Sequence, residues 1–439
     1  MAKIRTEHSR RVYERATRVM PAGVSSNSRW RDPYPLYFRS ASGATLVDVD
    51  GNRFIDLVLG NGAVVLGHHD PAVDESVRRG LETGLTIGVE WERTAELAEL
   101  FLSVVPTMDK VRFTNTGTEA MLHALQLARA ATGRPKVAKA EGSYHGWADS
   151  MFVSVFHDLS QAGTPDSPRT VPSTPGLDPH AVAQTLVFPF NDTERARDFI
   201  ANNARDLAAV VLEPVMIDIG FVPARREYVQ MLRRACTEHG VILIFDEVLT
   251  SFRLAPGGAQ EYYGVTPDLA IYGKAMSNGY PIAAVAGLDD LMRLYEPRKG
   301  PAFVGTFNGH VIPVSAALGA LPRLADGTAQ KELEAGTERL QRAFRAMSDD
   351  AGISASFAGG AGHFQWYFGD APVVDYRTAA ACNPHLCQIF AQALIDQQIF
   401  VGSNLLSHQA ISLAHSETTL DRVEHAMAKA MRACAARRD

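Results

Sequence analysis

The chain has 439 residues, of which 46% are hydrophobic and 21% charged, as in a globular protein with enough apolar material for a large core. The net charge is −6 and the basic residues are scattered, which argues against nucleic acid as a partner and favours a small molecule. The four cysteines form no CxxC pair, so neither a metal site nor a disulfide framework is indicated. No apolar run approaches the roughly 20 residues that span a bilayer, and no signal peptide is evident, so we expect a cytoplasmic protein that binds no membrane.

Residues 1–60 predict an N-terminal helix and a β-ribbon that pack with a small domain. Apolar residues recur at helical spacing over 7–20, and Pro-Ala-Gly at 21–23 then stops the pattern. Two β-like runs flank the Asp-Gly-Asn turn at 50–52, and Asp-Gly is typical of hairpins. We therefore expect an antiparallel ribbon after the helix.

The middle of the chain predicts an α/β fold with a mostly parallel sheet. Short apolar runs alternate there with helix-like stretches, which indicates a large domain over 61–310. The pattern then changes to helices with a few strands, so a smaller C-terminal domain is expected over 311–439. A segment rich in Pro, Gly, Ser and Thr lies between Val153 and His180. It is too long for a routine connector, and we interpret it as a lid.

Three predicted strands end in charged side chains, at Glu213, Asp246 and Lys274. Because ligands bind at the carboxyl edge of a parallel sheet, these side chains are expected to converge on one crevice. An amine desolvated at the end of a buried strand becomes nucleophilic, which is Schiff-base chemistry, and a carboxylate there can hold a protonated ring nitrogen. Taken alone, such an aspartate more often caps a turn, and an isolated lysine more often extends into solvent.

A further pattern indicates an anion site. A strand runs into Thr116, Gly117 and Thr118 and then directly into a long helix, so backbone amides and hydroxyls are available for a phosphate. An ordinary helix cap has the same pattern. Tyr144 and His145 follow another apolar run, where an aromatic ring either stacks on a planar ligand or packs in the core.

Several motifs together resemble class III aminotransferases, and in particular the glutamate-1-semialdehyde 2,1-aminomutase branch, over about residues 8–435. The motifs are TNTGTEA at 114–120, EGSYHG at 141–146, LEPV at 212–215, FDEVLTSFR at 245–253, GKAMSNGYP at 273–281 and GTFNG at 305–309. The resemblance implies a fold type I enzyme that depends on pyridoxal phosphate (PLP), with a mostly parallel seven-stranded sheet in the large domain and a smaller α+β C-terminal domain.

The resemblance also implies roles for individual residues around PLP. Lys274 forms the internal aldimine, Asp246 pairs with the pyridine nitrogen, Val248 packs beneath the ring and Tyr144 stacks on its other face. His145 and Glu213 belong to the same cofactor site.

The phosphate of PLP is expected to bind to Thr116, Gly117 and Thr118. Thr306 in GTFNG then completes this site from the neighbouring subunit, so the resemblance implies a homodimer. Arg29 falls where family members bind a substrate carboxylate, although a surface arginine is an equal alternative.

Three departures from the branch concern the substrate. Asn61 lies in a segment that usually begins with tryptophan, and Ser407 lies in a stretch that lacks the usual glutamate. Asp218 replaces part of the usual Gly-Asn after Glu-Pro-Val, which places an unusual anion near the cofactor's phenolic oxygen.

These departures favour an aminotransferase that moves an amino group between an amino acid or amine and a keto or aldehyde acceptor. We expect the substrate to be non-standard or part of specialised metabolism. The alternatives are glutamate-1-semialdehyde 2,1-aminomutase itself, a PLP-dependent racemase or epimerase, and a non-catalytic PLP-binding protein.

Overall fold

The computed structural model describes residues 4–86, 88–404 and 406–437, and it divides into two compact units. Unit 1 is built from three separate stretches of the chain, and unit 2 from two. Unit 1 consists of Met1–Asp70, Lys331–Pro372 and Ala381–Asp439. Unit 2 consists of Pro71–Gln330 and Val373–Ala380.

These boundaries differ from the domain ends predicted at residues 60 and 310. Helix α11 (Val311–Ala320) belongs to unit 2 because it packs on α3 (Pro71–Glu82) of the same unit. The two helices approach closely, since a Cβ atom at Gly80 would lie 2.2 Å from Ser315 Oγ. No signal in the apolar spacing of α11 distinguishes packing on α3 from packing in a C-terminal domain.

Unit 2 is organised around a seven-stranded sheet, counted over the described residues, with the strand order β4-β14-β13-β12-β9-β5-β8. The strands β13, β12, β9, β5 and β8 pair in parallel, whereas β14 runs antiparallel to both of its neighbours. The predicted α/β class with a mostly parallel seven-stranded sheet is therefore confirmed. The bounds of the seven strands are β4 Lys110–Thr114, β14 Ala283–Gly287, β13 Leu269–Tyr272, β12 Ile242–Asp246, β9 Leu207–Leu212, β5 Lys136–Ala140 and β8 Thr185–Phe188.

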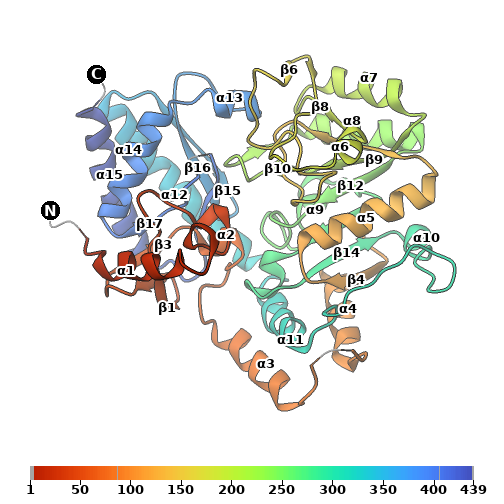
Figure 1. The fold of residues 1–439 in the computed structure, drawn as a ribbon, viewed down its shortest axis with the longest axis horizontal. Helices are drawn as coiled ribbons and strands as arrows, with labels where there is room; N and C mark the ends of the chain where they lie inside the picture. Colours follow the sequence, from red (N-terminus) through yellow and green to blue (C-terminus); the bar gives the residue numbers. More distant parts are fainter. Residues whose placement is uncertain (1–3, 87, 405, 438–439) are drawn as a thin grey trace. The chain divides into compact units, whose positions relative to one another are not determined.

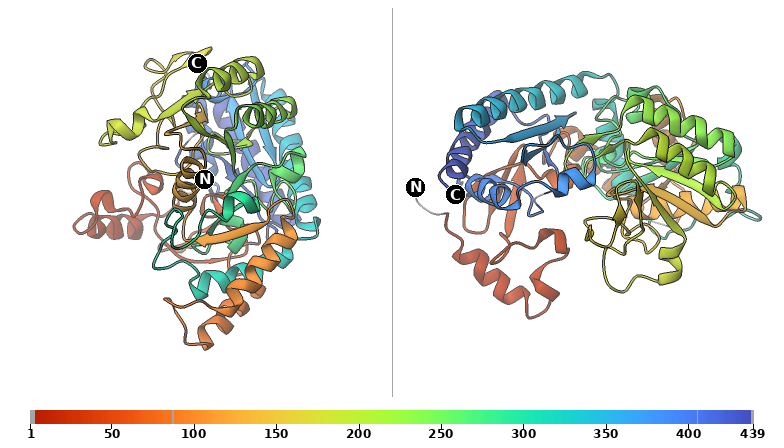
Figure 2. Two further views of the ribbon diagram at one scale, coloured as in Figure 1. Left: turned by 90° about the vertical axis from the view of Figure 1, so that its right-hand side faces the viewer. Right: turned by 90° about the horizontal axis from the view of Figure 1, so that it is seen from above.

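The sheet forms because its central strands are apolar without interruption. Every residue of β9 is buried, as expected for a parallel strand with both faces covered. Helix α5 (Gly117–Thr132) contacts β9, β13 and β14, while α8 (Arg226–His239) contacts β12 (Figures 1 and 2). Buried side chains of α5, including Met121, Leu125 and Ala128, share one core cluster with the strands.

The remaining elements of unit 2 are short strands and helices around this sheet. The two-residue strands form the pairs β6 Gly163–Thr164 with β7 Ser167–Pro168 and β10 Val215–Met216 with β11 Val222–Pro223. The helices are α4 Glu92–Val104, α6 Pro179–Ala183, α7 Thr193–Asn203, α9 Ala259–Tyr263, α10 Asp289–Met292 and α13 Tyr376–Ala380, with 3₁₀ turns η3 Lys274–Ser277 and η4 Leu321–Arg323.

Unit 1 contains the N-terminal and C-terminal parts of the chain. One sheet has the order β1-β2-β3-β17, and the turn at 50–52 joins β2 to β3 as an antiparallel hairpin. The bounds of its strands are β1 Phe38–Ser42, β2 Thr45–Asp48, β3 Arg53–Asp56 and β17 Ile399–Phe400. A second sheet consists of β15 Ala355–Gly360, β16 His363–Phe368 and β18 Gln409–Ala410.

The N-terminal helix is shorter than its sequence pattern. Helix α1 spans Glu7–Ala16 instead of 7–20, and Val19, which follows it, is 80% exposed. The chain then passes through the 3₁₀ turns η1 Pro21–Gly23 and η2 Asn27–Arg29. The other helices are α2 Leu59–Gly62, α12 Thr328–Ala351, which begins in unit 2, α14 Pro384–Asp396 and α15 Glu417–Ala435.

Candidate active site

Asp246 stands at the carboxyl end of β12, where the buried strand leaves the sheet. Its Oδ2 lies 2.8 Å from His145 Nδ1, and its Oδ1 accepts a hydrogen bond of 3.1 Å from the backbone N–H of Val248. The His145 side chain is fully buried, and that of Asp246 is 8% exposed. Burial lowers the pKa of His145, although Asp246 opposes this shift. The aspartate is therefore held in a fixed orientation by a buried imidazole.

Lys274 follows β13, the neighbouring parallel strand, and begins the turn η3. Its backbone has φ of 47°, a left-handed conformation that is strained for a residue with a long side chain. Such strain persists only where the surroundings impose it, and it occurs most often at functional sites. Burial lowers the pKa of its amine, and the carboxylates of Asp218, Asp246 and Glu213 oppose this shift. A lowered pKa increases the neutral, nucleophilic fraction of the amine.

The N-terminus of α5 presents backbone N–H groups to the same region. Thr116 caps the helix: its Oγ1 accepts from the N–H of Glu119 at 3.2 Å, and Glu119 Oε2 accepts from the N–H of Thr116 at 3.3 Å. A Cβ atom on Gly117 would lie 3.0 Å from Val248 Cγ2. A Cβ atom on Gly146, which has φ of 93°, would lie 2.6 Å from Thr118 Oγ1. The space beside the helix terminus therefore depends on two glycines.

These groups surround one cavity. The cavity contains most of the cofactor residues predicted from the sequence, while Thr116 and Thr118 flank Gly117 in the chain. Its lining consists of Gly117, Tyr144, His145, Gly146, Glu213, Asp218, Asp246, Val248, Leu249 and Lys274.

Sequence reasoning missed two residues of this lining, Gly146 and Leu249. Gly146 belongs to the motif EGSYHG, and its position directly after His145 is a signal that could have been used. Leu249 is one of several apolar residues after Asp246, and its sequence gives no sign that it faces a ligand.

Carboxyl groups make up much of the cavity's polar lining. Burial, Asp218 and Asp246 together raise the pKa of Glu213 well above its ordinary value. Burial also raises the pKa of Asp218, although the amine of Lys274 opposes this. Tyr144 has its pKa raised to about 12, first by burial and then by Asp218 and Asp246, so its hydroxyl stays protonated.

The buried carboxyl group of Glu213 accepts two hydrogen bonds from the backbone. Its Oε1 accepts a hydrogen bond of 2.8 Å from the N–H of Ile217, and its Oε2 accepts one of 3.4 Å from the N–H of Tyr144. The side chain thus links the loop after β9 to the loop that carries Tyr144.

Besides Thr116 and Thr118, four predicted residues lie outside this lining. Thr306 lines a second cavity of unit 2, together with Trp91, Phe303 and Asn308. Arg29, Asn61 and Ser407 belong to unit 1. Asn61 has φ of 55°, which asparagine tolerates better than most residues. The backbone carbonyl of Ser407 accepts hydrogen bonds from Gln365 and Gln409. The substrate roles of these three residues stay predictions.

The arrangement combines three features that one ligand can use together. A buried carboxylate, an amine with a lowered pKa and a helix N-terminus suit, respectively, a protonated ring nitrogen, an aldehyde and a phosphate. Across the described ranges 4–86, 88–404 and 406–437, no group of three or more His, Cys, Asp or Glu side chains is arranged to hold a metal ion. Over the same ranges, none of the helices is long and apolar enough to cross a membrane.

Comparison with known proteins identifies the family. A family model described as aminotransferase class-III matches residues 26–359. The chain belongs to the class III aminotransferases. These are PLP-dependent enzymes of fold type I, and the resemblance stated from the motifs is therefore confirmed. The residues that line the cavity fit PLP, because the two glycines leave room beside the helix N-terminus and Lys274 lies in the same cavity as Asp246.

Proteins that match nearly the whole of this chain are named for different activities. Glutamate-1-semialdehyde 2,1-aminomutase of Methanothermobacter thermautotrophicus is 38% identical over 423 residues, which cover 95% of this chain and 98% of that protein. An omega-transaminase from Sphaerobacter thermophilus has a TM-score of 0.92 at 32% identity and covers 97% of both chains. A transaminase solved with PLP bound has a TM-score of 0.89 at 32% identity, covering 99% of both chains.

Proposed function

We propose that Lys274 is the lysine that bonds to the aldehyde of PLP and later moves protons at the substrate carbon. Its lowered pKa, its strained backbone and its place in the cavity with Asp246 support this role. When bound, PLP supplies an electron sink that stabilises negative charge at the substrate carbon. The observation that carries the proposal is that one buried cavity contains both the amine of Lys274 and the carboxylate of Asp246.

The other lining residues orient the cofactor. Asp246, held by His145, is proposed to keep the pyridine nitrogen protonated, as a buried anion favours the charged form of a neighbouring base. Val248 and Tyr144 are proposed to cover the two faces of the ring. The first turn of α5, with Thr116, Gly117 and Thr118, is proposed to bind the phosphate through N–H groups and hydroxyls.

At the level of the substrate, we propose glutamate-1-semialdehyde 2,1-aminomutation, in which the amino group moves between two carbons of one molecule. Support comes from the aminomutase at 38% identity, which this chain matches over nearly the full length of both proteins. The comparisons thus favour the alternative of the sequence analysis over its main interpretation.

A second candidate is amino transfer between a separate donor and acceptor. The omega-transaminase with a TM-score of 0.92 supports it, as do the departures at Asn61, Asp218 and Ser407. Asp218 is the most informative of these, because it lines the cofactor cavity and interacts electrostatically with Lys274.

One experiment separates these functions. Holoenzyme is mixed with the semialdehyde alone and, separately, with amines and amino acids, while the absorbance of the cofactor and the products are followed. Isomerisation of the semialdehyde supports the aminomutase, whereas conversion of the cofactor to its aminated form by another donor, with no isomerisation, supports the second candidate. An amino acid that loses its chirality without a keto product indicates a racemase. Full turnover by Lys274→Ala would contradict the role proposed for the lysine.

We further propose a homodimer in which Thr306 completes the phosphate site of the partner subunit. Thr306 does not line the PLP cavity of its own chain, and the neighbouring Val304 and Phe307 are 74% and 56% exposed. Exposed apolar side chains of this size are typical of an interaction surface. Mixed dimers of Lys274→Ala and Thr306→Glu chains should regain activity that neither variant has alone, because one site then contains both native residues. No gain on mixing would contradict the shared site. A cytoplasmic location stays a prediction.

A further inference from the structure

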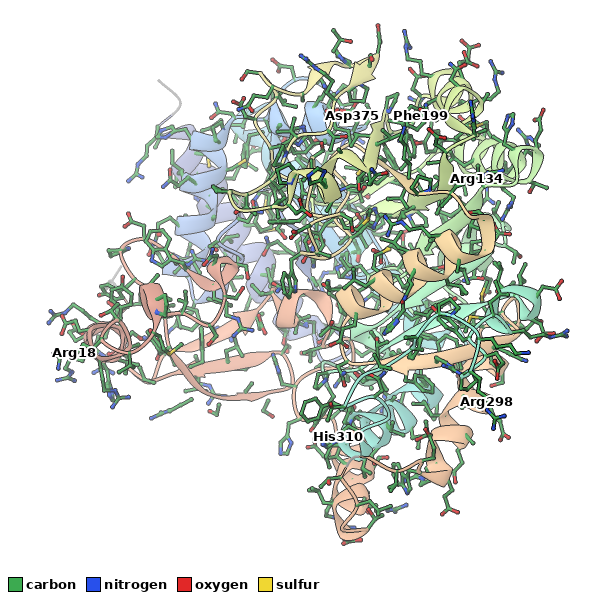
Figure 3. All side chains as sticks on the ribbon, turned by 45° about the vertical axis from the view of Figure 1, so that its right-hand side comes forward. Arg18, Arg134, Phe199, Arg298, His310 and Asp375 are labelled. Atoms are coloured by element: carbon green, nitrogen blue, oxygen red, sulfur yellow. The ribbon has the colours of Figure 1, made fainter. Side chains whose placement is uncertain are left out.

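The segment Val373–Ala380 belongs to unit 2, although the chain on both sides of it belongs to unit 1. Helix α13 forms most of this segment and lies beside the loop that carries β6 (Figure 1). Asp375, labelled in Figure 3, begins the helix by accepting a hydrogen bond of 2.8 Å from the N–H of Thr378. The carbonyl of Val374 accepts one of 3.1 Å from Asn191 Nδ2. The segment is thus folded and fixed to unit 2.

Arg377 joins the segment Val373–Ala380 to the rest of unit 2 through an ion pair. The guanidinium donates to both carboxylate oxygens of Glu141, with Nε–Oε2 and Nη2–Oε1 distances of 2.7 and 2.9 Å. It also donates to the carbonyls of Ala162 and Gly163, each at 3.2 Å. The side chains of Arg377 and Glu141 are 17% and 7% exposed, so this two-pronged ion pair is largely shielded from water.

Tyr376 packs against His157 and Gly142. Its hydroxyl donates to the carbonyl of His157 at 2.9 Å, and its ring stacks on the imidazole of His157 with centroids 4.7 Å apart. Gly142, with φ of 85°, lies so close that a Cβ atom there would be 2.2 Å from Tyr376 Cβ. Only glycine fits at this position.

Glu141 and Gly142 are directly followed by residues of the cofactor cavity. After Ser143 come Tyr144, whose N–H donates to Glu213, and His145, which lies 2.8 Å from Asp246. Fixing the first two residues of this loop therefore limits the positions that the next residues can take. The two hydrogen bonds to carboxylates cannot form if the loop moves by more than a fraction of their length.

We propose that Arg377 is a positioning residue which, through Glu141, holds Tyr144 and His145 in place for PLP; this inference rests on the proposed function. Glu141 of the ion pair lies at the start of the loop, and the cavity residues Tyr144 and His145 follow it within four positions in the sequence. Arg377 itself is not part of the cavity lining.

The test compares three variants of the full-length chain. Arg377→Met removes the ion pair, and Arg377→Lys keeps the charge but not the two-pronged contact. Arg233→Met is the control, because Arg233 makes a similarly shielded ion pair, with one contact of 2.9 Å to Asp268 and side chains that are 22% and 19% exposed. Asp268 precedes β13, so this pair lies at the sheet edge opposite to Lys274. Each protein is examined for thermal stability, PLP dissociation constant and visible circular dichroism of bound PLP.

We expect Arg377→Met to weaken PLP binding about tenfold and to reduce the circular dichroism of the cofactor, as loss of a supporting contact does at metal sites. Arg377→Lys should lie between it and wild type, and Arg233→Met should change stability only. Equal losses of stability in Arg377→Met and Arg233→Met with unchanged PLP affinity would overturn the inference. If Arg377→Met does not fold, wild-type affinity and dichroism in Arg377→Lys would overturn it. Failure of the wild-type chain to bind PLP at all would instead contradict the proposed function.

Discussion

Gly117→Ala tests the phosphate site most directly, because it adds one methyl group beside the N-terminus of α5. Alanine in place of glycine stabilises a helix by about 0.4–1 kcal/mol. The new methyl would lie 3.0 Å from Val248 Cγ2, and overpacking of this kind costs roughly 1–3 kcal/mol. The gain offsets only part of the cost, so the free energy of unfolding should fall by between about 0 and about 2.6 kcal/mol.

Binding of PLP should weaken as well, because the added methyl group occupies space beside the N–H groups proposed to hold the phosphate. A hydrogen bond to a charged group contributes about 1.5–3 kcal/mol, and losing one to the phosphate weakens binding roughly ten- to hundredfold. Apo-protein is titrated with PLP by absorbance, and stability is measured by urea unfolding. Gly336→Ala in α12 is the control, since its Cβ would lie 2.6 Å from Ile411 Cδ1, the flexible end of a side chain outside the cavity. Wild-type PLP affinity in Gly117→Ala would refute the proposed phosphate site.

Three further predictions concern single side chains. Tyr144→Ala should weaken PLP binding about two- to tenfold through loss of an aromatic contact, whereas Tyr144→Phe should bind normally; equal titration curves for the two would contradict stacking. Asp218→Asn removes the carboxylate that most raises the pKa of Lys274, so the pH at which apo-protein reacts half-maximally with pyridoxal should fall, and a rise would contradict the assigned interaction. Burial lowers the pKa of His415 from 6.5 to about 4. The neutral imidazole therefore contributes its full stabilisation above pH 6.5, and up to about 3 kcal/mol of the free energy of unfolding is lost as the pH falls to 4. His415→Gln should lose less stability over this interval in urea unfolding, and a parallel decline would count against the buried imidazole.

Much of the fold was predictable because local patterns coincide with tertiary environment. The unbroken apolar runs that became β9, β12 and β13 can only be buried on both faces, which requires a parallel sheet covered by helices. The domain ends were not predictable in the same way. Helix α11 is apolar on all sides, so its sequence does not specify which neighbour it packs against.

The candidate site shows a similar division. Residues at strand ends and at a helix N-terminus were found because their element fixes where they point, as for Asp246 and Gly117. Arg377 gave no signal, since an arginine in a short helix far along the chain looks like a surface residue. Its partner Glu141 is 236 positions away in sequence, and only the folded chain brings the two together.

The charges in the cofactor cavity also restrict how a substrate can bind. Three carboxyl groups, those of Glu213, Asp218 and Asp246, line the cavity with the amine of Lys274. Burial and mutual repulsion already raise the pKa of Glu213 and Asp218, so a further anion close to them would raise the cost of ionisation again. Under the proposed function, a substrate carboxylate therefore needs cationic groups outside this lining. That requirement is independent of the family resemblance, and it leads to the same kind of side chain as the sequence prediction for Arg29.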